Sequence, residues 1–330
     1  MENNLKIVRK KWIDVLRSLA MLFVIYGHLL EKSDYSYIYY VFTSPIKIPL
    51  FFAISGYLLN ENVNLVTFLR KILRGLVIPW LVLSVVPVFL VSILKGRAYL
   101  FSNIKAILSG ISFWYMPCCI LAEIMFYFVL KICNKKSIPV LGSSVVLSSL
   151  GVFFVNTGVL DLLMFNRALS TQLFLTMGYF IKKYDGELDK VKKVHLYIGA
   201  GIYVAFGVLS IFLFPGQNLD VHKGDYYNLP ICLIMVILGC FLLFEIGKRL
   251  DFKNGILSFI GRNTLVYYML ASYPITVYNV LISKVGINLG DTYLSAIIKS
   301  IFVCCLCAVF ALFINAIIPE AVGKKRKAGN

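Results

Sequence analysis

Three ionisable residues, Asp14, Arg17 and His28, lie within the apolar stretch 12–30, WIDVLRSLAMLFVIYGHLL. The stretch is long and apolar enough to span a bilayer. Ionisable side chains at membrane depth are costly, so they usually serve a function and face a cavity or a partner helix. An imidazole can also exchange protons near neutral pH. We therefore interpret the stretch as a candidate reaction track through a membrane, with a structural hydrogen bond of His28 across helices as the alternative.

The spacing of these residues predicts that they share one face of a helix. At about 100° per residue, the steps from Arg17 to His28 return the chain to within roughly 20° of the same direction. A rise of about 1.5 Å per residue separates the two side chains by about 16 Å along the helix. Asp14 lies one turn from Arg17, where an ion pair between the two is possible.

Composition indicates the class of protein that carries this stretch. The chain has 330 residues, of which 59% are hydrophobic and 15% are charged, and its mean hydropathy is +0.82. Soluble proteins contain about 25% charged residues. Because apolar segments recur from end to end, we expect a polytopic helical membrane protein without a separate soluble domain.

We predict an all-α protein with a single membrane domain, residues 1–330. Its ten expected spans are 12–30, 38–59, 76–94, 113–132, 138–155, 168–181, 195–214, 229–247, 256–282 and 294–318. The sixth is short for a span. Pro45 and Pro49 predict that the second is kinked or partly re-entrant. Within it, Ser55 and Gly56 predict either a close helix contact or a substrate contact.

The formal net charge of +17 follows mainly from Lys and Arg residues in the loops between spans. Of these residues, 22 fall on the side of both termini and seven fall on the other side. This bias places both termini in the cytoplasm, with basic ends at residues 1–11 and 319–330. Arg17 then lies near the cytoplasmic face and His28 in the outer half. The basic segments predict contacts with membrane lipids, and no nucleic-acid partner is expected.

Five further residues are candidates for a site. Arg70 and Arg74 are four residues apart and form either an ordinary basic flank or a cytoplasmic anion site. Trp114 and Tyr115 are either residues of the membrane interface or contacts for a substrate. Glu123 lies inside a span, where a carboxylate needs a partner or a cavity.

The remaining His and Cys residues suggest no further chemistry. The eight cysteines lie in or beside apolar segments, and we interpret them as small packing residues. None has the spacing of a metal ligand, so no metal site is predicted. His195 and His222 fall in loops or at a span edge, where we expect solvated side chains.

The motifs of the chain, taken in order, resemble those of the acyltransferase 3 family of integral-membrane O-acyltransferases, which includes fucose 4-O-acetylase-like members. An Arg followed after ten residues by a His is the opening motif, here R-SLAMLFVIYG-H. The other matching segments are IPLFFAISGYLL at 48–59, FLRKILRGLVIPW at 68–80, FWYMPCCILAEI at 113–124, LFLTMGYFIKK at 173–183 and FIGRNTLVYYMLASYPI at 259–275. Two features depart from the family pattern: Arg70 and Arg74 are more widely spaced, and the stretch YYMLASYPI lacks a His.

The resemblance implies transfer of an acyl group, usually acetyl, from cytoplasmic acyl-CoA to a hydroxyl group of a glycan. It implies His28 as general base or transient acyl carrier, and Asp14 and Arg17 as organisers of the donor end. Arg70 and Arg74 would contact donor phosphates. Glu123 would orient a cationic or hydroxyl group, with Trp114, Tyr115 and Ser55 as substrate contacts.

The resemblance also implies a multi-pass protein of the bacterial cell membrane, working with exopolysaccharide or capsule biosynthesis machinery. Transport is the main alternative, since an exporter or flippase for a polysaccharide or lipid-linked sugar would also be polytopic. Consumption of acyl-CoA distinguishes the two. A glycan polymerase or glycosyltransferase is a third alternative, but it predicts larger external loops with more acidic residues than this chain has.

Overall fold

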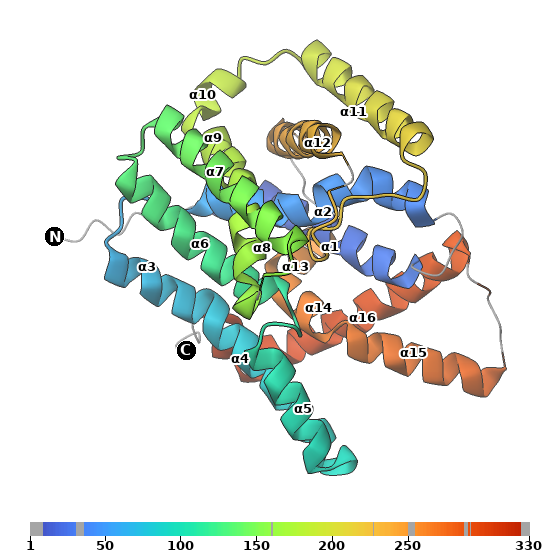
Figure 1. The fold of residues 1–330 in the computed structure, drawn as a ribbon. Helices are drawn as coiled ribbons and strands as arrows, with labels where there is room; N and C mark the ends of the chain where they lie inside the picture. The colour runs from blue at the N-terminus through green and yellow to red at the C-terminus, as the bar shows by residue number, and fades with distance from the viewer. Residues whose placement is uncertain are drawn as a thin grey trace.

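The computed structural model describes residues 9–30, 36–159, 161–226, 228–249, 255–286, 290 and 292–324. Parts of the two predicted basic ends, residues 1–8 and 325–330, lie outside this range. The described residues form sixteen α-helices and no extended sheet (Figure 1). The α-helices are α1 (Lys11–Leu30), α2 (Ser36–Leu58), α3 (Leu65–Ile72), α4 (Ile78–Lys95), α5 (Arg97–Leu108), α6 (Tyr115–Ile132), α7 (Ser137–Asn156), α8 (Phe165–Ser170), α9 (Gln172–Lys183), α10 (Asp185–Leu188), α11 (Lys193–Leu213), α12 (Leu229–Arg249), α13 (Gly255–Arg262), α14 (Thr264–Leu270), α15 (Ser272–Val285) and α16 (Tyr293–Ile317).

The helix lengths confirm an all-α polytopic membrane protein. Among the described residues, eight helical stretches are long and apolar enough to cross a membrane, and a bent pair raises the number to nine. One stretch joins α3 to α4 through a π-helical turn, η1 (Leu73–Val77), and so begins well before the predicted residue 76. The bent pair is α14 and α15, which meet at 53° where one straight span was predicted. Pro274 follows the break, and proline is a common cause of such bends.

The predicted span 168–181 corresponds to two short helices, α8 and α9, which separate at Thr171. Together they run antiparallel to α7. Near one end Ser148 Oγ accepts a hydrogen bond from Leu173 N at 3.1 Å, and further along Thr176 bonds to Ser144 at 2.6 Å. The break explains why the sequence segment looked short. The amphipathic helix α5 was not predicted, since its residues resemble an ordinary basic loop.

Helix α2 is continuous through Pro45 and Pro49, so of the two predicted alternatives, a kinked or a partly re-entrant segment, the second was wrong. Proline removes backbone donors, and neighbouring helices replace them. Pro45 deprives the Val41 carbonyl of its helical donor, and beside it the carbonyl of Phe42 accepts a hydrogen bond from Tyr203 Oη of α11 at 2.5 Å. The Pro45 carbonyl, which Pro49 deprives of its helical donor, lies 4.0 Å from the Cys240 thiol of α12. The Cys240 thiol thus takes the place of the donor that Pro49 removes.

Helices α1 and α2 form the centre of the fold (Figure 1). More than half of the apolar stretch of each helix is buried inside the protein, 56% for α1 and 61% for α2. The corresponding share is 17% for α11 and for α16. Glycines bring other helices against this centre. A Cβ at Gly56 would lie 2.0 Å from the Leu175 carbonyl oxygen of α9, which confirms the predicted close contact. A Cβ at Gly261 would lie 1.7 Å from the Asp14 carbonyl oxygen, so α13 packs directly on the backbone of α1.

Candidate functional site

One face of α1 lines two cavities. Arg17, Met21 and Val24 line a cavity of about 210 Å³, which we call the Arg17 cavity. Val24 and His28 line a second cavity of about 380 Å³, the His28 cavity. The four residues follow one another at helical spacing, so the structure confirms that Arg17 and His28 share a face. This face borders a cavity at the Arg17 end and another cavity at the His28 end.

The two cavities are neighbours that share part of their lining. Val24, Ile48 and Tyr268 belong to both, contributed by α1, α2 and α14. Trp114 and Tyr115, adjacent in sequence at the start of α6, face different cavities. Trp114 lines the His28 cavity and Tyr115 lines the Arg17 cavity. The backbone N–H of Tyr115 donates to Tyr268 Oη at 3.2 Å, which fixes this junction.

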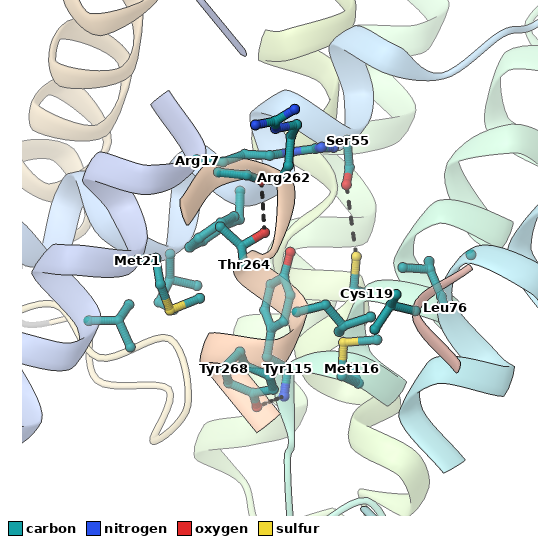
Figure 2. A pocket seen from close by; sticks show the side chains of 17 residues that line it. Arg17, Met21, Ser55, Leu76, Tyr115, Met116, Cys119, Arg262, Thr264 and Tyr268 are labelled. Carbon is teal, nitrogen blue, oxygen red and sulfur yellow. Dashed lines mark hydrogen bonds between the residues drawn. The ribbon is translucent and has the colours of Figure 1, made fainter. Parts of the chain in front are cut away.

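The Arg17 cavity is lined by two arginines and by no Asp or Glu side chain among the described residues. Arg262, at the end of α13, joins Arg17 there because Gly261 lets the two helices approach (Figure 2). Neither guanidinium group forms an ion pair within 4.0 Å among the described residues, and two such groups around one cavity suit an anionic ligand. Arg262 was not among the predicted site residues, although it lies in the segment FIGRNTLVYYMLASYPI that supported the family resemblance.

Ser55 and Cys119 also line this cavity (Figure 2). Ser55 Oγ lies 3.9 Å from Cys119 Sγ. One turn further along α6, Glu123 accepts a hydrogen bond from the Cys119 thiol at 3.7 Å. Glu123 also interacts electrostatically with Arg17. The predicted residues Ser55, Tyr115 and Glu123 are therefore brought together with Arg17.

Asp14 forms its ion pair with Arg9, and the possible pair with Arg17 does not form. Arg9 Nε and Nη2 reach the two carboxylate oxygens of Asp14 at 2.7 and 2.8 Å. The hydrogen bond to Asp14 raises the pKa of Arg9 above its usual value. Asp14 is nearly buried beneath α13, and Arg9 reaches it from outside the helix. Arg17 is left to face its cavity, with Asp14 as an electrostatic neighbour.

The C-terminal segment covers one side of the Arg17 cavity. Val322, the last residue of the 3₁₀ turn η3 (Pro319–Val322), belongs to the lining. Lys324 Nζ donates to Asn263 Oδ1 at 2.8 Å and to Asn315 Oδ1 at 2.7 Å. Burial, together with the positive charges of Arg9 and Arg262, lowers the pKa of Lys324. Both described ends of the chain therefore meet on the Arg17 side of the molecule.

Arg70 and Arg74 are exposed and lie outside the described lining of both cavities. Arg70 belongs to α3 and Arg74 to the π-helical turn η1. Gly75 and Leu76 of the same turn do line the Arg17 cavity. Arg74 thus directly precedes two lining residues in sequence, but neither arginine lines the cavity.

The His28 cavity combines an exposed imidazole with aromatic and polar side chains. Its lining residues are Val24, His28, Ser36, Tyr37, Tyr40, Ser44, Lys47, Ile48, Trp114, Gly216, Asn218, Leu219, Asp220, Val221, His222, Lys223 and Tyr268. About half of the wall comes from the loop between α11 and α12. Lys47 Nζ sits 4.3 Å from the centre of the Tyr40 ring, a cation–π contact.

His222 was predicted to be solvated, and this prediction was wrong. Its ring packs against Trp114 with 4.9 Å between ring centres, and it lines the same cavity as His28. Burial is the main cause that lowers the pKa of His222 below its usual value. His195, by contrast, is exposed as expected. The sequence signal that was overlooked is the turn DVHKGD at 220–225, which directs a loop residue back toward the helices.

The cysteines and acidic residues give no sign of a metal site. All eight cysteines are free, and six of them are buried, as expected of packing residues. Within the described residues, no three His, Cys, Asp or Glu side chains come together in a way that could hold a metal ion.

Comparison with known proteins identifies the family. A family model described as an acyltransferase domain, Acyl_transf_3, matches residues 10–316, nearly the whole chain. No curated protein and no solved structure matches the chain. The match includes both arginines of the Arg17 cavity and both histidines of the His28 cavity. The chain therefore belongs to the acyltransferase 3 family and is a membrane acyltransferase.

Proposed function

We propose that this protein transfers an acyl group, most simply acetyl, from cytoplasmic acyl-CoA to a hydroxyl group of a cell-surface or lipid-linked glycan. We place it in the bacterial cell membrane, with the Arg17 cavity toward the cytoplasm and the His28 cavity toward the outside. Membership of the family supports acyl transfer, and the excess of Lys and Arg on the side of both termini supports the orientation.

The observation that carries the proposal is the meeting of two chemically different cavities along α1. The Arg17 cavity presents two guanidinium groups, which suit the phosphates or the thioester region of an acyl-CoA. The His28 cavity presents imidazole, aromatic and hydroxyl groups, which suit a sugar. Since Val24, Ile48 and Tyr268 line both, a donor in one can face an acceptor in the other.

In this mechanism His28 acts as general base. The acceptor oxygen attacks the thioester carbonyl and forms the new C–O bond, and His28 takes the hydroxyl proton. The C–S bond then breaks, and the CoA thiolate leaves. Arg17 and Arg262 hold the donor, and Arg70 and Arg74 attract its phosphates from outside the cavity. Holding both reactants in one place supplies much of the rate.

The predicted substrate contacts divide between the two sides. Trp114 provides an aromatic surface for the acceptor in the His28 cavity. Tyr115 and Ser55 border the acyl end of the donor, and Glu123 orients the polar groups there. The acceptor is supplied by exopolysaccharide or capsule biosynthesis machinery, which would act before or beside this protein.

Mass spectrometry of surface glycans tests the proposal. Cells with the intact gene should carry glycans heavier by one acyl group per modified residue than cells that lack it, and the mass difference identifies the acyl group. Purified protein should also bind acetyl-CoA. Unchanged glycan mass together with failure to bind acetyl-CoA would contradict the proposal and favour a polysaccharide exporter or flippase.

A further inference from the structure

His222 reaches the His28 cavity from a different part of the fold. His28 lies in the last turn of α1, whereas His222 lies in the loop between α11 and α12. Both side chains line the cavity, and the two interact electrostatically. Of the three histidines in the chain, two are thus gathered at one cavity, while His195 is exposed elsewhere.

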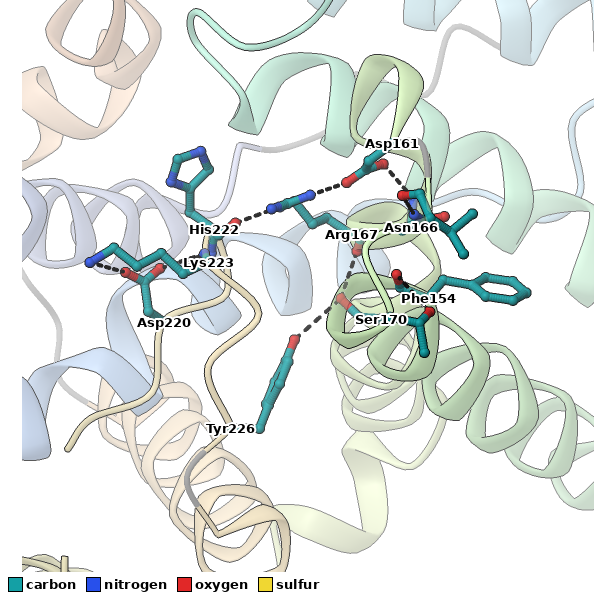
Figure 3. A network of polar contacts seen from close by, with 11 residues as sticks. Phe154, Asp161, Asn166, Arg167, Ser170, Asp220, His222, Lys223 and Tyr226 are labelled. Atoms are coloured by element: carbon teal, nitrogen blue, oxygen red, sulfur yellow. Dashed lines mark hydrogen bonds and ion pairs between the residues drawn. The ribbon is translucent and has the colours of Figure 1, made fainter.

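The backbone of His222 is held by a set of polar contacts (Figure 3). Arg167 Nε donates to the His222 carbonyl oxygen, and Asp161 pairs with the same guanidinium group. Arg167 and Asp161 are mostly buried, with side-chain exposures of 18% and 14%. Asp220 Oδ1 accepts hydrogen bonds from the backbone N–H groups of His222 at 2.9 Å and Lys223 at 3.1 Å.

A second contact ties the same loop to α8. Tyr226 Oη lies 3.2 Å from Ser170 Oγ, so the loop is attached to α8 at His222 and again four residues later. A buried arginine and carboxylate are expensive to place in a membrane protein. Here they serve to fix one loop residue whose side chain projects away from them (Figure 3). Such a clamp is expected where the position of a side chain matters for a ligand.

The imidazole itself is oriented, and its surroundings favour its neutral form. Its ring packs against Trp114, which restricts its rotation. Burial lowers the pKa of His222, as do the positive charges of Arg167, Lys223 and His28, while Asp220 opposes them. Lys47 is a further cation of the same cavity. A neutral imidazole can accept a hydrogen bond from a sugar hydroxyl group, which a protonated one cannot.

We propose that His222 is an acceptor-binding residue, which accepts a hydrogen bond from a hydroxyl group of the glycan and turns it toward His28. The inference rests on the proposed function for the nature of the ligand. The clamp of Arg167, Asp161 and Asp220 holds His222 in place, and the loop between α11 and α12 forms the wall that selects the acceptor. His28 and His222 thereby contact the acceptor from two sides.

The first test compares His222→Gln with two matched controls in cells. His195→Gln makes the same change at an exposed site, and Asp225→Asn changes an exposed side chain of the same loop that does not line the cavity. We expect His222→Gln to lower glycan-bound acyl groups about tenfold, because the amide lacks the ring contact with Trp114 that holds the acceptor atom in place, so the hydrogen bond to the glycan is lost. Both controls should keep the wild-type level. Acylation by His222→Gln at the wild-type level, with equal protein in the membrane, would overturn the proposal.

The second test needs no acyl transfer, so it separates failure of this inference from failure of the proposed function. Purified full-length protein is treated with diethyl pyrocarbonate across a range of pH, and modification of each histidine is measured by peptide mass spectrometry. The midpoint for His222 should lie below the ordinary histidine value of 6.5, and it should rise in His28→Gln. A midpoint for His222 at or above 6.5 that does not change with the His28 substitution would show that His222 does not face His28. That result would overturn the inference even if glycan acylation were found.

Discussion

The Arg17 cavity and the His28 cavity differ in how the fold builds them. The first is enclosed mainly by helices, α1, α2, α6, α13 and α14, with the turns η1 and η3 at its border. The second takes about half of its wall from the loop between α11 and α12. The first presents permanent positive charge, and the second presents titratable imidazoles. The shape of the Arg17 cavity is therefore set mainly by helix packing, whereas the shape of the His28 cavity depends on the contacts that hold one loop.

Replacement of Arg17 should damage the first cavity and leave the second intact. We expect Arg17→Gln to weaken acetyl-CoA binding by about 10- to 100-fold, because a charge-assisted contact to the donor is lost. Isothermal titration of purified protein measures this. Arg70→Gln, which changes an exposed arginine, should have a smaller effect. If Arg70→Gln weakened acetyl-CoA binding more than Arg17→Gln, the donor would bind at α3 and not in the Arg17 cavity.

Replacement of Arg167 should damage the His28 cavity and leave the Arg17 cavity intact. Arg167→Gln removes the clamp on the His222 carbonyl and leaves Asp161 without its partner. We expect glycan acylation to fall by about three- to tenfold while acetyl-CoA binding is kept. Arg97→Gln, at an exposed position on α5, is the matched control. A loss of acetyl-CoA binding in Arg167→Gln would show that the two cavities are not separable.

The smallest expected effect concerns stability and pH. The pKa of His222 in the folded protein lies below its ordinary value of 6.5. A lowered pKa means that its contribution to stability is present above 6.5 and is lost as the pH falls through the folded value. Between about pH 7 and pH 5 the Tm of the wild type should therefore fall more than that of His222→Gln, by a few degrees at most. An identical pH dependence of the two proteins would contradict the burial of His222.

The helical part of this architecture could be predicted from the sequence. Hydrophobic length identified the long spans, and helical periodicity placed Arg17 and His28 on one face. Both signals are local, because they depend on residues within one helix. The same holds for Ser55 and Gly56, whose small side chains predicted the close contact with α9. Trp114 and Tyr115 were predicted as a pair, and only the structure separates them between two cavities.

The other features of the two cavities could not be predicted from the sequence, because they depend on contacts between distant segments of the chain. Arg262 reaches the Arg17 cavity because Gly261 packs on the carbonyl of Asp14, about 250 residues earlier in the chain. His222 reaches the other cavity because Arg167 holds its loop. Asp14 pairs with Arg9, which lies outside the predicted helix, rather than with Arg17. Each is a tertiary contact that no periodicity within a single helix records.

The most direct test of the whole account is the acyl content of surface glycans in cells that produce His28→Ala. The matched control is His195→Ala, and both proteins must reach the wild-type level in the membrane. The account predicts loss of glycan acylation in His28→Ala and full acylation in His195→Ala, because His28 takes the proton of the acceptor hydroxyl group. Acylation at the wild-type level in His28→Ala would contradict it.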